Sequence, residues 1–308
     1  MISKIRKFIT NPRIRFSYLT ELGLTRWMSD EQFLKKEYYL AMGKPLNLDN
    51  PQTFNEKLQW LKIHNRKPEY TTMVDKYAAK QYVADRIGSQ YIIPTLGVWD
   101  HFDDIDFDVL PDQFVLKCTH DSGGLVICKD KSRLNKKAAK RKIEHCLRRK
   151  YYYVHREWPY KDVKPRIIAE KYMADDFDSN KLESLTDYKF FCFDGTVDSV
   201  MLCMDRNTGD TKFYFFSPDW KLLRINKRGK AAPSNFTLPK PICMDEMITL
   251  AQELSKGLPY VRIDLYQCAG RVYFGEITFF PDSGFDPNIL PETDLAWGEK
   301  LILPKKRG

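Results

Sequence analysis

The alternation of apolar and polar positions predicts a helical N-terminal part followed mainly by strands. Residues 1–70 read as helical, and one helix there has Asp30 as a candidate N-cap and Gly43 as its stop signal. A second amphipathic helix is expected to end near Gly88, followed by a short strand at 91–93. The first quarter of the chain is therefore expected to be built mostly from helices.

Strands dominate the chain beyond residue 111. A basic helix is expected at 135–152 and another helix at 245–256. The apolar, β-prone runs are FVLKCT, LVICKD, RIIAEKYM, YKFFCFDG, VDSVMLCMD, KFYFFS, VRIDLY and RVYFGEITF. Helices and strands alternate without a regular βαβ period, so the pattern favours an α+β fold with mixed or antiparallel sheets. The chain divides into four parts, which are 1–70, 71–110, 111–175 and 176–308.

The net charge of +9 is concentrated in two stretches. Residues 1–67 hold thirteen Lys/Arg against six Asp/Glu, and residues 129–171 hold sixteen against five. Such surfaces suit phosphorylated substrates, acidic glycans or membrane surfaces. No helix-turn-helix, zinc-finger or RNP-type signature accompanies the charge, so nucleic acid is not expected as a partner. The first sixteen residues fit either a helix lying on an anionic bilayer or a solvated docking helix, and Pro12 interrupts them.

The lack of recognisable targeting signals and the pattern of cysteines point to the cytoplasm. The sequence has no uncharged apolar run of about 18 residues and no signal-peptide core. Its seven cysteines form no CxxC or zinc-type spacing, so they read as reduced thiols. We expect a cytoplasmic protein that could lie at the inner face of the cytoplasmic membrane.

Two carboxylates interrupt the apolar runs VRIDLY and RVYFGEITF. These are Asp264 and Glu276, and a Cys-Ala-Gly turn joins their strands into an expected hairpin. A carboxylate in a strand that is otherwise buried costs several kcal/mol unless a partner compensates it. A pair on neighbouring strands offers oxygen ligands for Mg²⁺, which binds one or two carboxylates together with substrate phosphates. The alternative is that both side chains simply face solvent on an edge strand.

A second candidate site follows the strand that ends at Lys117. The loop THDSGG contains Gly123 and Gly124, whose backbone can approach an anion closely and form a phosphate-binding nest. An ordinary hairpin turn is the alternative. Further along, Glu170 ends a strand whose edge could pair with an adenine ring, and Lys189 is embedded in another strand.

The order of these pieces resembles the ATP-grasp fold. A helix with Asp-Lys, a strand Lys with a Gly-rich loop, a strand Glu, a strand Lys, and R-x-D and E-x-T strands follow one another. More narrowly, the chain resembles the TupA-like ATP-grasp family of bacterial surface-polysaccharide and teichuronopeptide biosynthesis, through FNEKLQWLK, VDKYAAKQYV, IIPTLGVWD, FVLKCTHDSGG, DYKFFCFDG and GEITFFPDSGF. The resemblance runs from about residue 30 to 300. It implies two α+β lobes that clamp ATP, a small lobe at 111–175 and a large lobe with the metal site at 176–308.

The resemblance implies roles in the nucleotide site. Lys117 would contact the α- or β-phosphate of ATP, and Glu170 would hold the adenine together with the backbone near Met173. One of Asp176 and Asp178 would take the ribose hydroxyls. The loop residues expected at the phosphates are His120, Ser122, Gly123 and Gly124.

The resemblance also implies metal and substrate residues. Asp264 and Glu276 would carry Mg²⁺, and Thr278, which stands where many ATP-grasp enzymes have Asn, would be a third ligand. Lys189 would face the γ-phosphate, and Arg262 would steady an acyl-phosphate or carboxylate, which makes both catalytic candidates. The residues expected to hold a carboxylate substrate are Arg262, Ser283 and Gly284.

The implied function is an ATP- and Mg²⁺-dependent carboxylate–amine ligase that forms an amide through an acyl-phosphate. Expected substrates are a uronic acid of a capsular or O-antigen polysaccharide, or of its lipid-linked or nucleotide-linked precursor, and an amine such as an amino acid. A glycosyltransferase of the same pathway is one alternative, with DxD pairs at Asp104/Asp106, Asp106/Asp108 and Asp176/Asp178. A non-catalytic membrane-associated scaffold that uses the basic N-terminus is the other.

Overall fold

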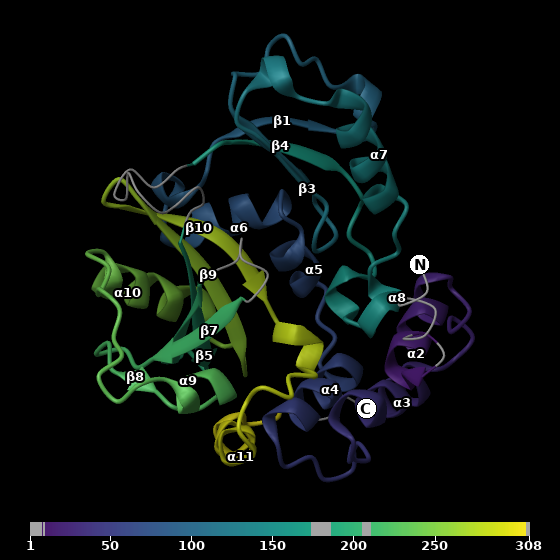
Figure 1. Ribbon diagram of the computed structural model, residues 1–308, viewed down its shortest axis with the longest axis vertical. Coiled ribbons are helices and arrows are strands. Elements are labelled where there is room, and N and C mark those ends of the chain that lie inside the picture. Colours follow the sequence, from purple (N-terminus) through teal and green to yellow (C-terminus); the bar gives the residue numbers. More distant parts are fainter. Residues whose placement is uncertain (1–7, 9, 174–185, 205–210, 306–308) are drawn as a thin grey trace.

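Two antiparallel sheets and a set of N-terminal helices make up the protein (Figure 1). A computed structural model describes residues 8, 10–173, 186–204 and 211–305. The α+β class is confirmed. None of the helices in these ranges is long and apolar enough to cross a membrane.

The smaller sheet has the strand order β1-β4-β2-β3 and is antiparallel throughout. Its strands are β1 (Thr95–Trp99), β4 (Ile167–Lys171), β2 (Phe114–Cys118) and β3 (Leu125–Cys128). Alternate residues of β2, namely Phe114, Leu116 and Cys118, are fully buried and share a core with Ile143 of helix α7 (Lys136–Leu147). The small lobe was expected to begin at residue 111. Strand β1 lies before that point but pairs with β4, so it belongs to the small sheet.

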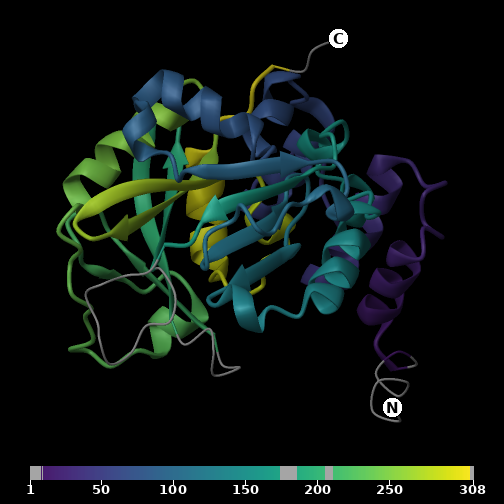
Figure 2. The same ribbon diagram turned by 90° about the horizontal axis from the view of Figure 1, so that it is seen from above.

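The larger sheet has the order β10-β9-β5-β6-β7-β8. Its strands are β5 (Asp187–Phe193), β6 (Thr196–Met204), β7 (Lys212–Phe216), β8 (Leu222–Leu223), β9 (Val261–Cys268) and β10 (Arg271–Thr278). Helix α10 (Met244–Ser255) covers one face, and every residue of β5 is buried. The opposite face looks toward the small sheet, as the view from above shows (Figure 2).

The remaining helices join the two sheets and extend the molecule. The α-helices are α2 (Pro12–Glu21), α3 (Asp30–Met42), α4 (Phe54–His64), α5 (Glu69–Val74), α6 (Ala78–Ile87), α8 (Tyr152–His155), α9 (Lys227–Ala231) and α11 (Pro291–Lys300). Short 3₁₀ turns are η1 (Ser89–Tyr91), η2 (Phe102–Asp104), η3 (Lys131–Arg133), η4 (Trp158–Tyr160) and η6 (Pro281–Gly284). The ring of Phe54 on α4 packs against Tyr260 and Trp297, at centroid distances of 4.8 and 5.3 Å, and so ties α4 and α11 to the large sheet.

Several local predictions differ from the structure for identifiable reasons. Helix α3 is capped by Ser29, whose hydroxyl accepts from the Gln32 amide, so Asp30 is the first helical residue. The amphipathic helix before Gly88 is two helices, because Asp75 breaks it and its carboxylate accepts from the amides of Tyr77 and Ala78.

Two further elements lie away from their predicted positions. Residues 91–93 form no strand. The turn η1 ends at Tyr91, and β1 begins only at Thr95, after Pro94. The helix expected over 135–152 ends at Leu147. The hairpin of β9 and β10 is as predicted, and its turn residues Ala269 and Gly270 have φ values of 49° and 71°.

Candidate active site

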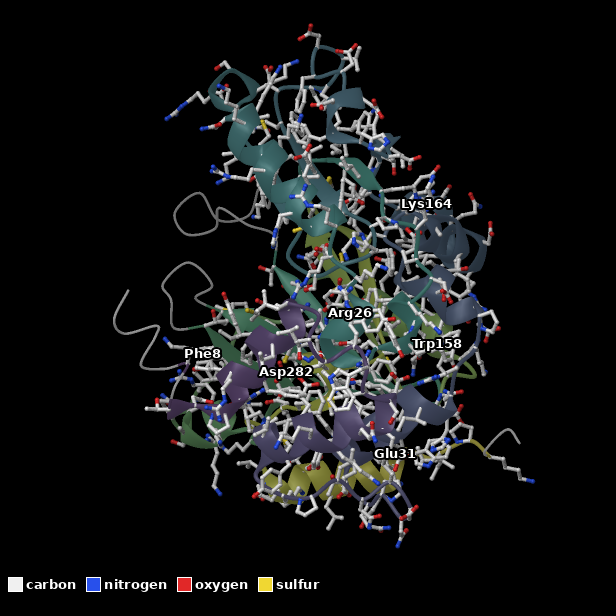
Figure 3. The ribbon with its side chains drawn as sticks, turned by 90° about the vertical axis from the view of Figure 1, so that its right-hand side faces the viewer. Phe8, Arg26, Glu31, Trp158, Lys164 and Asp282 are labelled. Carbon is white, nitrogen blue, oxygen red and sulfur yellow. The ribbon has the colours of Figure 1, made fainter. Side chains whose placement is uncertain are left out.

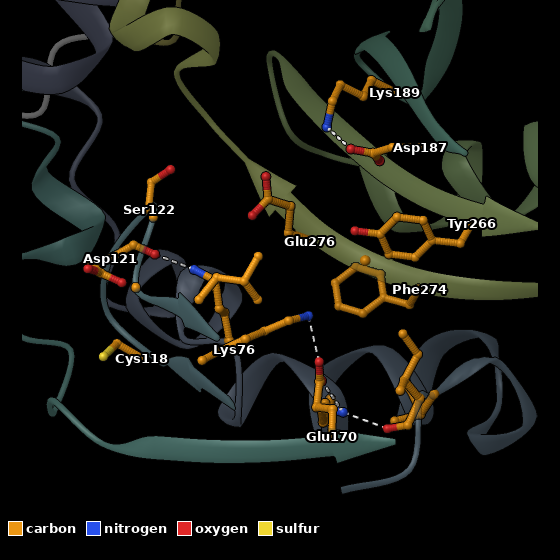
Figure 4. A pocket seen from close by; sticks show the side chains of 18 residues that line it. Lys76, Cys118, Asp121, Ser122, Glu170, Asp187, Lys189, Tyr266, Phe274 and Glu276 are labelled. Atoms are coloured by element: carbon orange, nitrogen blue, oxygen red, sulfur yellow. Dashed lines mark hydrogen bonds and ion pairs between the residues drawn. The ribbon is translucent and has the colours of Figure 1, made fainter. Parts of the chain in front are cut away.

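A cavity of about 300 Å³ lies between the two sheets (Figure 4). Its lining comes from both sheets and from the segment around α6. The residues are Lys76, Lys80, Ile92, Ile93, Lys117, Cys118, Asp121, Ser122, Gly123, Gly124, Leu125, Glu170, Asp187, Lys189, Tyr266, Phe274, Gly275 and Glu276. Phe274 and Tyr266 lie on one side of the cavity, and Lys76 lies on the other side beside Asp121 and Ser122 of the glycine loop (Figure 4).

The glycine loop joins β2 to β3 and is anchored at its base. The hydroxyl of Thr119 donates to the Lys164 carbonyl, and the Lys76 amide donates to the Thr119 carbonyl. The Lys76 ammonium donates to the Asp121 carbonyl at 2.5 Å. Gly123 has φ = 103°, a conformation that favours glycine, and lies in the cavity wall. The segment is thus a hairpin loop, as the simpler interpretation expected, and it also lines the cavity.

Glu170 lies between two lysines on the small-sheet side of the cavity. Its carboxylate oxygens are each 2.6 Å from an ammonium group, one from Lys80 and the other from Lys117. Burial opposes ionisation of Glu170, but the charges of Lys117 and Lys80 hold its pKa below the usual value. In this arrangement Glu170 orients two cations at the cavity wall.

A network of charges covers the large-sheet side. Arg262 forms a fork with Asp264, with Nε–Oδ1 and Nη2–Oδ2 distances of 2.6 and 2.8 Å. Lys189 pairs with Asp264 and with Asp187. The strand register brings these charged side chains together, because Asp264 stands opposite Lys189 on β5 and opposite Glu276 on β10. Asp264 is completely buried, which excludes the solvent-facing alternative for that residue.

Glu276 is the carboxylate of the β9–β10 hairpin that faces the cavity. Its side chain is 39% exposed, and its Oε1 lies 3.1 Å from Arg262 Nη2. Arg262 also donates to the Thr278 hydroxyl, at 3.1 Å. Burial raises the pKa of Asp264 to about 6, whereas the charges of Lys76 and Arg262 outweigh burial at Glu276 and lower its pKa to about 2. Arg262 and Lys189 both supply counter-charge to Asp264, and Arg262 also supplies it to Glu276.

A β-bulge aims Glu276 at the cavity. The pairing of β10 with β9 shifts register between Phe274 and Glu276, and Gly275 is the extra residue. A Cβ atom on Gly275 would lie 2.8 Å from the Tyr266 ring and 2.9 Å from the Asp264 carbonyl oxygen. Only glycine fits here without a shift of the backbone.

We therefore expect Gly275→Ala to lower both stability and activity. The methyl group has to push β9 and β10 apart, and such overpacking costs roughly 1–3 kcal/mol. Unfolding by denaturant and a turnover assay measure the two effects. A variant with wild-type stability and turnover would contradict the role given to the bulge.

Helix α4 holds the loop that follows β10. Three polar residues of FNEKLQWLK share one face: Asn55, Gln59 and Lys62. The Lys62 ammonium donates to Ser283 O at 2.8 Å, Gln59 donates to Gly284 O at 2.7 Å, and Asn55 accepts from the Asp286 amide. Lys62 is fully buried, and burial lowers its pKa to about 8. The motif thus acts as a support for the 281–286 loop.

A second cavity, of about 260 Å³, adjoins the charge network. Lys189 lines both cavities, and Arg262 lines the second. Its other residues are Phe54, Asn55, Phe191, Met201, Phe213, Phe215, Asn226, Pro281, Asp282, Asp286, Asn288 and Ile289. Its walls combine the aromatic side chains of Phe54, Phe191, Phe213 and Phe215 with polar and charged residues.

The structure brings many of the predicted site residues together. Those that line the first cavity are Lys117, Ser122, Gly123, Gly124, Glu170, Lys189 and Glu276. The ring of His120 does not line it, since its Nε2 lies 3.1 Å from the Arg149 carbonyl. The Ser283 hydroxyl donates to Glu157 at 2.6 Å. Asp176 and Asp178 lie outside the described residues, and Met173, Thr278 and Gly284 line neither cavity.

Sequence reasoning missed several residues of the first cavity wall. They include Lys76, Lys80, Asp187, Tyr266 and Phe274. Lys76 and Lys80 stand four residues apart in VDKYAAKQYV, a spacing that places side chains on one helix face and could have drawn attention to them. The two aromatic residues gave no such signal, because apolar residues in strands usually read as core.

A cleft between two antiparallel sheets, with a lysine-bearing glycine hairpin on one side and a carboxylate hairpin on the other, defines an ATP-grasp protein. The TupA-like ATP-grasp family model matches residues 56–302. The chain belongs to this family, which confirms both the predicted family and the predicted fold.

Solved structures that resemble this chain include two ligases and a synthetase. D-alanine–D-alanine ligase from Bacillus anthracis, complexed with ATP, is 15% identical over 74% of this chain and 60% of its own, with a TM-score of 0.42. The ligase PsnB, with a precursor variant, Mg and ADP, is 10% identical over 76% and 59%, with a TM-score of 0.43. The D-cycloserine synthetase DcsG is 14% identical over 75% and 69%, with a TM-score of 0.40. The chain thus spans less than two thirds of the first two. A search of curated protein sequences found no match.

Proposed function

We propose that the protein is an ATP- and Mg²⁺-dependent carboxylate–amine ligase. Family membership supports ATP as the nucleotide. The observation that carries the proposal is the junction of the two cavities at Lys189. A nucleotide whose γ-phosphate reaches Lys189 in the first cavity would meet an acid bound in the second, as an acyl-phosphate mechanism requires.

The first cavity suits ATP in one orientation. The base would lie beside Phe274 and Tyr266, and the phosphates would lie toward Lys76, Lys117 and the glycine loop. Both oxygens of Glu170 already pair with lysines, so Lys117 would turn from Glu170 to phosphate when ATP binds.

The residues of the charge network fit Mg²⁺ held jointly with phosphates. Glu276 faces the cavity, and its Oε2 has no hydrogen-bond partner among the described residues. Asp264 stands beside it, but its oxygens are taken by Arg262 and Lys189, so it could join the metal only if one cation moved away. Groups of three or more His, Cys, Asp or Glu side chains able to hold a metal are absent from the described part of the chain. Bound there, Mg²⁺ would neutralise charge on the β- and γ-phosphates.

The chemistry follows from this arrangement. A carboxylate oxygen of the acid attacks the γ-phosphorus, and ADP leaves. The amine nitrogen then attacks the acyl carbon of the acyl-phosphate, and phosphate leaves while the nitrogen loses its proton. Lys117, Lys189 and Arg262 would offset the negative charge on the transferred group, and the protein's main contribution is positioning.

We propose a uronic acid of a surface glycan, or of its lipid-linked or nucleotide-linked precursor, as the acid, and an amino acid or similar amine as the partner. The resemblance to the family's pathway and the excess of Lys and Arg over residues 129–171 support this choice. The place of action would be the cytoplasm, where ATP is available.

The structure gives less support to a glycosyltransferase. The pairs Asp104/Asp106 and Asp106/Asp108 lie around η2, and none of these residues lines either cavity beside the charge network. The third DxD pair, Asp176/Asp178, lies outside the described residues.

Thermal stabilisation separates the candidate functions. A ligand present at a hundred times its Kd stabilises the folded state by about 2.7 kcal/mol. Mg-ATP should raise the unfolding temperature, and nucleotide sugars should not. A shift with a nucleotide sugar alone would support glycosyl transfer, and a shift with neither would support the scaffold.

Lys117→Met is expected to weaken ATP binding much more than adenosine binding. The lost charge acts on phosphate, and charge-assisted contacts contribute about 1.5–3 kcal/mol, or roughly 10–100-fold in Kd. Titration calorimetry with both ligands measures the difference. Lys171→Met, at the exposed end of β4, is the matched control and should bind ATP normally. Equal losses for ATP and adenosine would show that Lys117 is structural.

Met201→Trp is expected to block the second cavity while leaving the first intact. Met201 lines only the second cavity, so substrate-dependent turnover should fall roughly 10–100-fold while the affinity for Mg-ATP stays unchanged. Met204→Trp, on the same strand but in neither lining, is the control. Unchanged turnover in Met201→Trp would remove the second cavity from the proposed substrate path.

A further inference from the structure

Helix α2 presents an apolar stripe to solvent. Ile14, Tyr18 and Leu22 follow one another at four-residue spacing, and they are 40%, 53% and 59% exposed. The opposite side of α2 packs inward through Phe16, whose ring lies 5.2 Å from that of Phe33 on α3. The stripe is therefore the outer face of a docked helix. Figure 3 shows the N-terminal helices, in purple, on the side of the molecule turned to the viewer.

The turn after α2 continues this apolar surface. Leu24 is 59% exposed and Trp27 is 80% exposed, and the Trp27 indole N–H donates to the Leu24 carbonyl. Of thirteen large apolar side chains that are exposed in the described part of the chain, five lie between residues 14 and 27. Scattered exposed apolar residues need no explanation, but this concentration does.

A basic cavity of about 320 Å³ lies directly beside the turn. Its lining residues are Thr20, Glu21, Arg26, His145, Arg148, Arg149, Lys150, Tyr153 and Val154. Arg26 lies between Leu24 and Trp27 in the chain, and its guanidinium stacks 5.2 Å from the Tyr153 ring. The apolar surface and the basic cavity are therefore parts of one face.

Within the described ranges, four cations of this cavity have no carboxylate partner. Among the residues that the structure describes, no carboxylate pairs with Arg26, Arg148, Arg149 or Lys150, and Glu21 is the one acid of the lining. Lysines elsewhere commonly form ion pairs. Lys140, which lies on α7 like His145 of the cavity, pairs with Asp103 in η2. A cluster of unpaired cations around a cavity suits a multiply charged anion.

We propose that this face docks on an anionic membrane surface, with the basic cavity holding a lipid phosphate headgroup and the apolar stripe lying in the bilayer interface. Exposed Trp, Tyr and Leu side chains beside Arg and Lys are the composition that binds membrane interfaces. A second copy of this chain is a poor occupant, because an isologous contact would bring two basic cavities together. The proposal is independent of the ligase assignment, since none of these residues lines the two cavities of the candidate active site.

The basic cavity of this face also lies close to the glycine loop that lines the first cavity. The Arg149 carbonyl, at the cavity, lies 3.1 Å from the ring Nε2 of His120, beside the loop that lines the first cavity. A substrate linked to a membrane lipid would thus be delivered beside the sheet cleft.

Vesicle co-sedimentation of the full chain tests the proposal. The vesicles are phosphatidylcholine alone and a 7:3 mixture of phosphatidylcholine with phosphatidylglycerol, on the order of the anionic content that gives a strong surface potential. One double variant, Leu24→Ser with Trp27→Ser, removes apolar contact, and another, Arg148→Ala with Lys150→Ala, removes charge. The controls are Ile242→Ser, exposed elsewhere, and Lys137→Ala with Arg141→Ala, exposed on α7 outside the cavity.

We expect binding to the anionic vesicles and little to the neutral ones. Each cation near an anionic surface contributes about fivefold, so the charge variant should lose roughly 25-fold in partitioning. The apolar variant should lose about tenfold, and both controls should stay within about twofold. Binding of inorganic phosphate by the wild-type protein, without partitioning onto the anionic vesicles, would assign the cavity to free phosphate and overturn the headgroup assignment. Equal binding by all variants, or a dimer in sedimentation analysis that Leu24→Ser with Trp27→Ser dissociates, would overturn membrane docking.

Discussion

Glu276→Gln is expected to abolish ATP turnover while leaving the protein folded. The substitution keeps the shape of the side chain but removes the charge that faces the cavity and would hold Mg²⁺ against the phosphates. Loss of several kcal/mol of charge stabilisation lowers turnover by roughly 10²–10³-fold or more. Because the side chain is 39% exposed, the fold should tolerate the change. ADP release measures turnover, and circular dichroism checks the fold.

Glu253→Gln provides the matched control for this prediction. Glu253 pairs with Lys256 at the end of α10, away from both cavities, so its loss should leave turnover unchanged. Near-normal turnover in Glu276→Gln would remove Glu276 from the metal site.

Asp264→Ala is expected to destabilise the fold strongly. The sequence pattern suggested Mg²⁺ as the partner of this carboxylate, but Arg262 and Lys189 both pair with it. Removing it leaves two buried cations without their main counter-charge, which costs about 3–5 kcal/mol. Unfolding by denaturant, followed by tryptophan fluorescence, measures the loss.

Two further variants test whether the lost ion pairs cause the destabilisation of Asp264→Ala. Asp219→Ala breaks an exposed pair with Lys221 and should leave the unfolding midpoint nearly unchanged. Asp264→Leu combined with Arg262→Met removes both partners of the fork. This double variant should regain much of the stability that Asp264→Ala loses, but it should remain inactive. If Asp264→Ala unfolds like the wild-type protein, the charge network does not stabilise the fold.

The strands were the most predictable part of the structure. Runs such as YKFFCFDG and VRIDLY combine β-branched and aromatic residues with clear turn signals, so the hairpin of Asp264 and Glu276 could be expected from local pattern alone. Boundaries near Asp75 and Pro94 were less predictable. They depend on side-chain caps and on pairing with β4, which is distant in sequence.

The site was only partly predictable, because its geometry depends on contacts between distant segments. The sequence identified Lys117, Glu170 and Lys189, but it could not show that Lys80 and Lys117 share Glu170 across two elements. It also could not show the second cavity, which is formed by side chains from α4, four strands of the large sheet and the 281–289 segment. Burial of Asp264 follows from its central place between β5 and β10, which emerges only once the strand order is known.

Transfer of oxygen from substrate to phosphate tests the ligase assignment most directly. The protein is incubated with Mg-ATP, a mixture of amino acids, and uronic-acid glycans labelled with ¹⁸O in the carboxylate, and the released phosphate is weighed by mass spectrometry. An acyl-phosphate route moves one carboxylate oxygen into each phosphate, so labelled phosphate is the expected result. ADP release that depends on the acid but yields unlabelled phosphate would contradict the account.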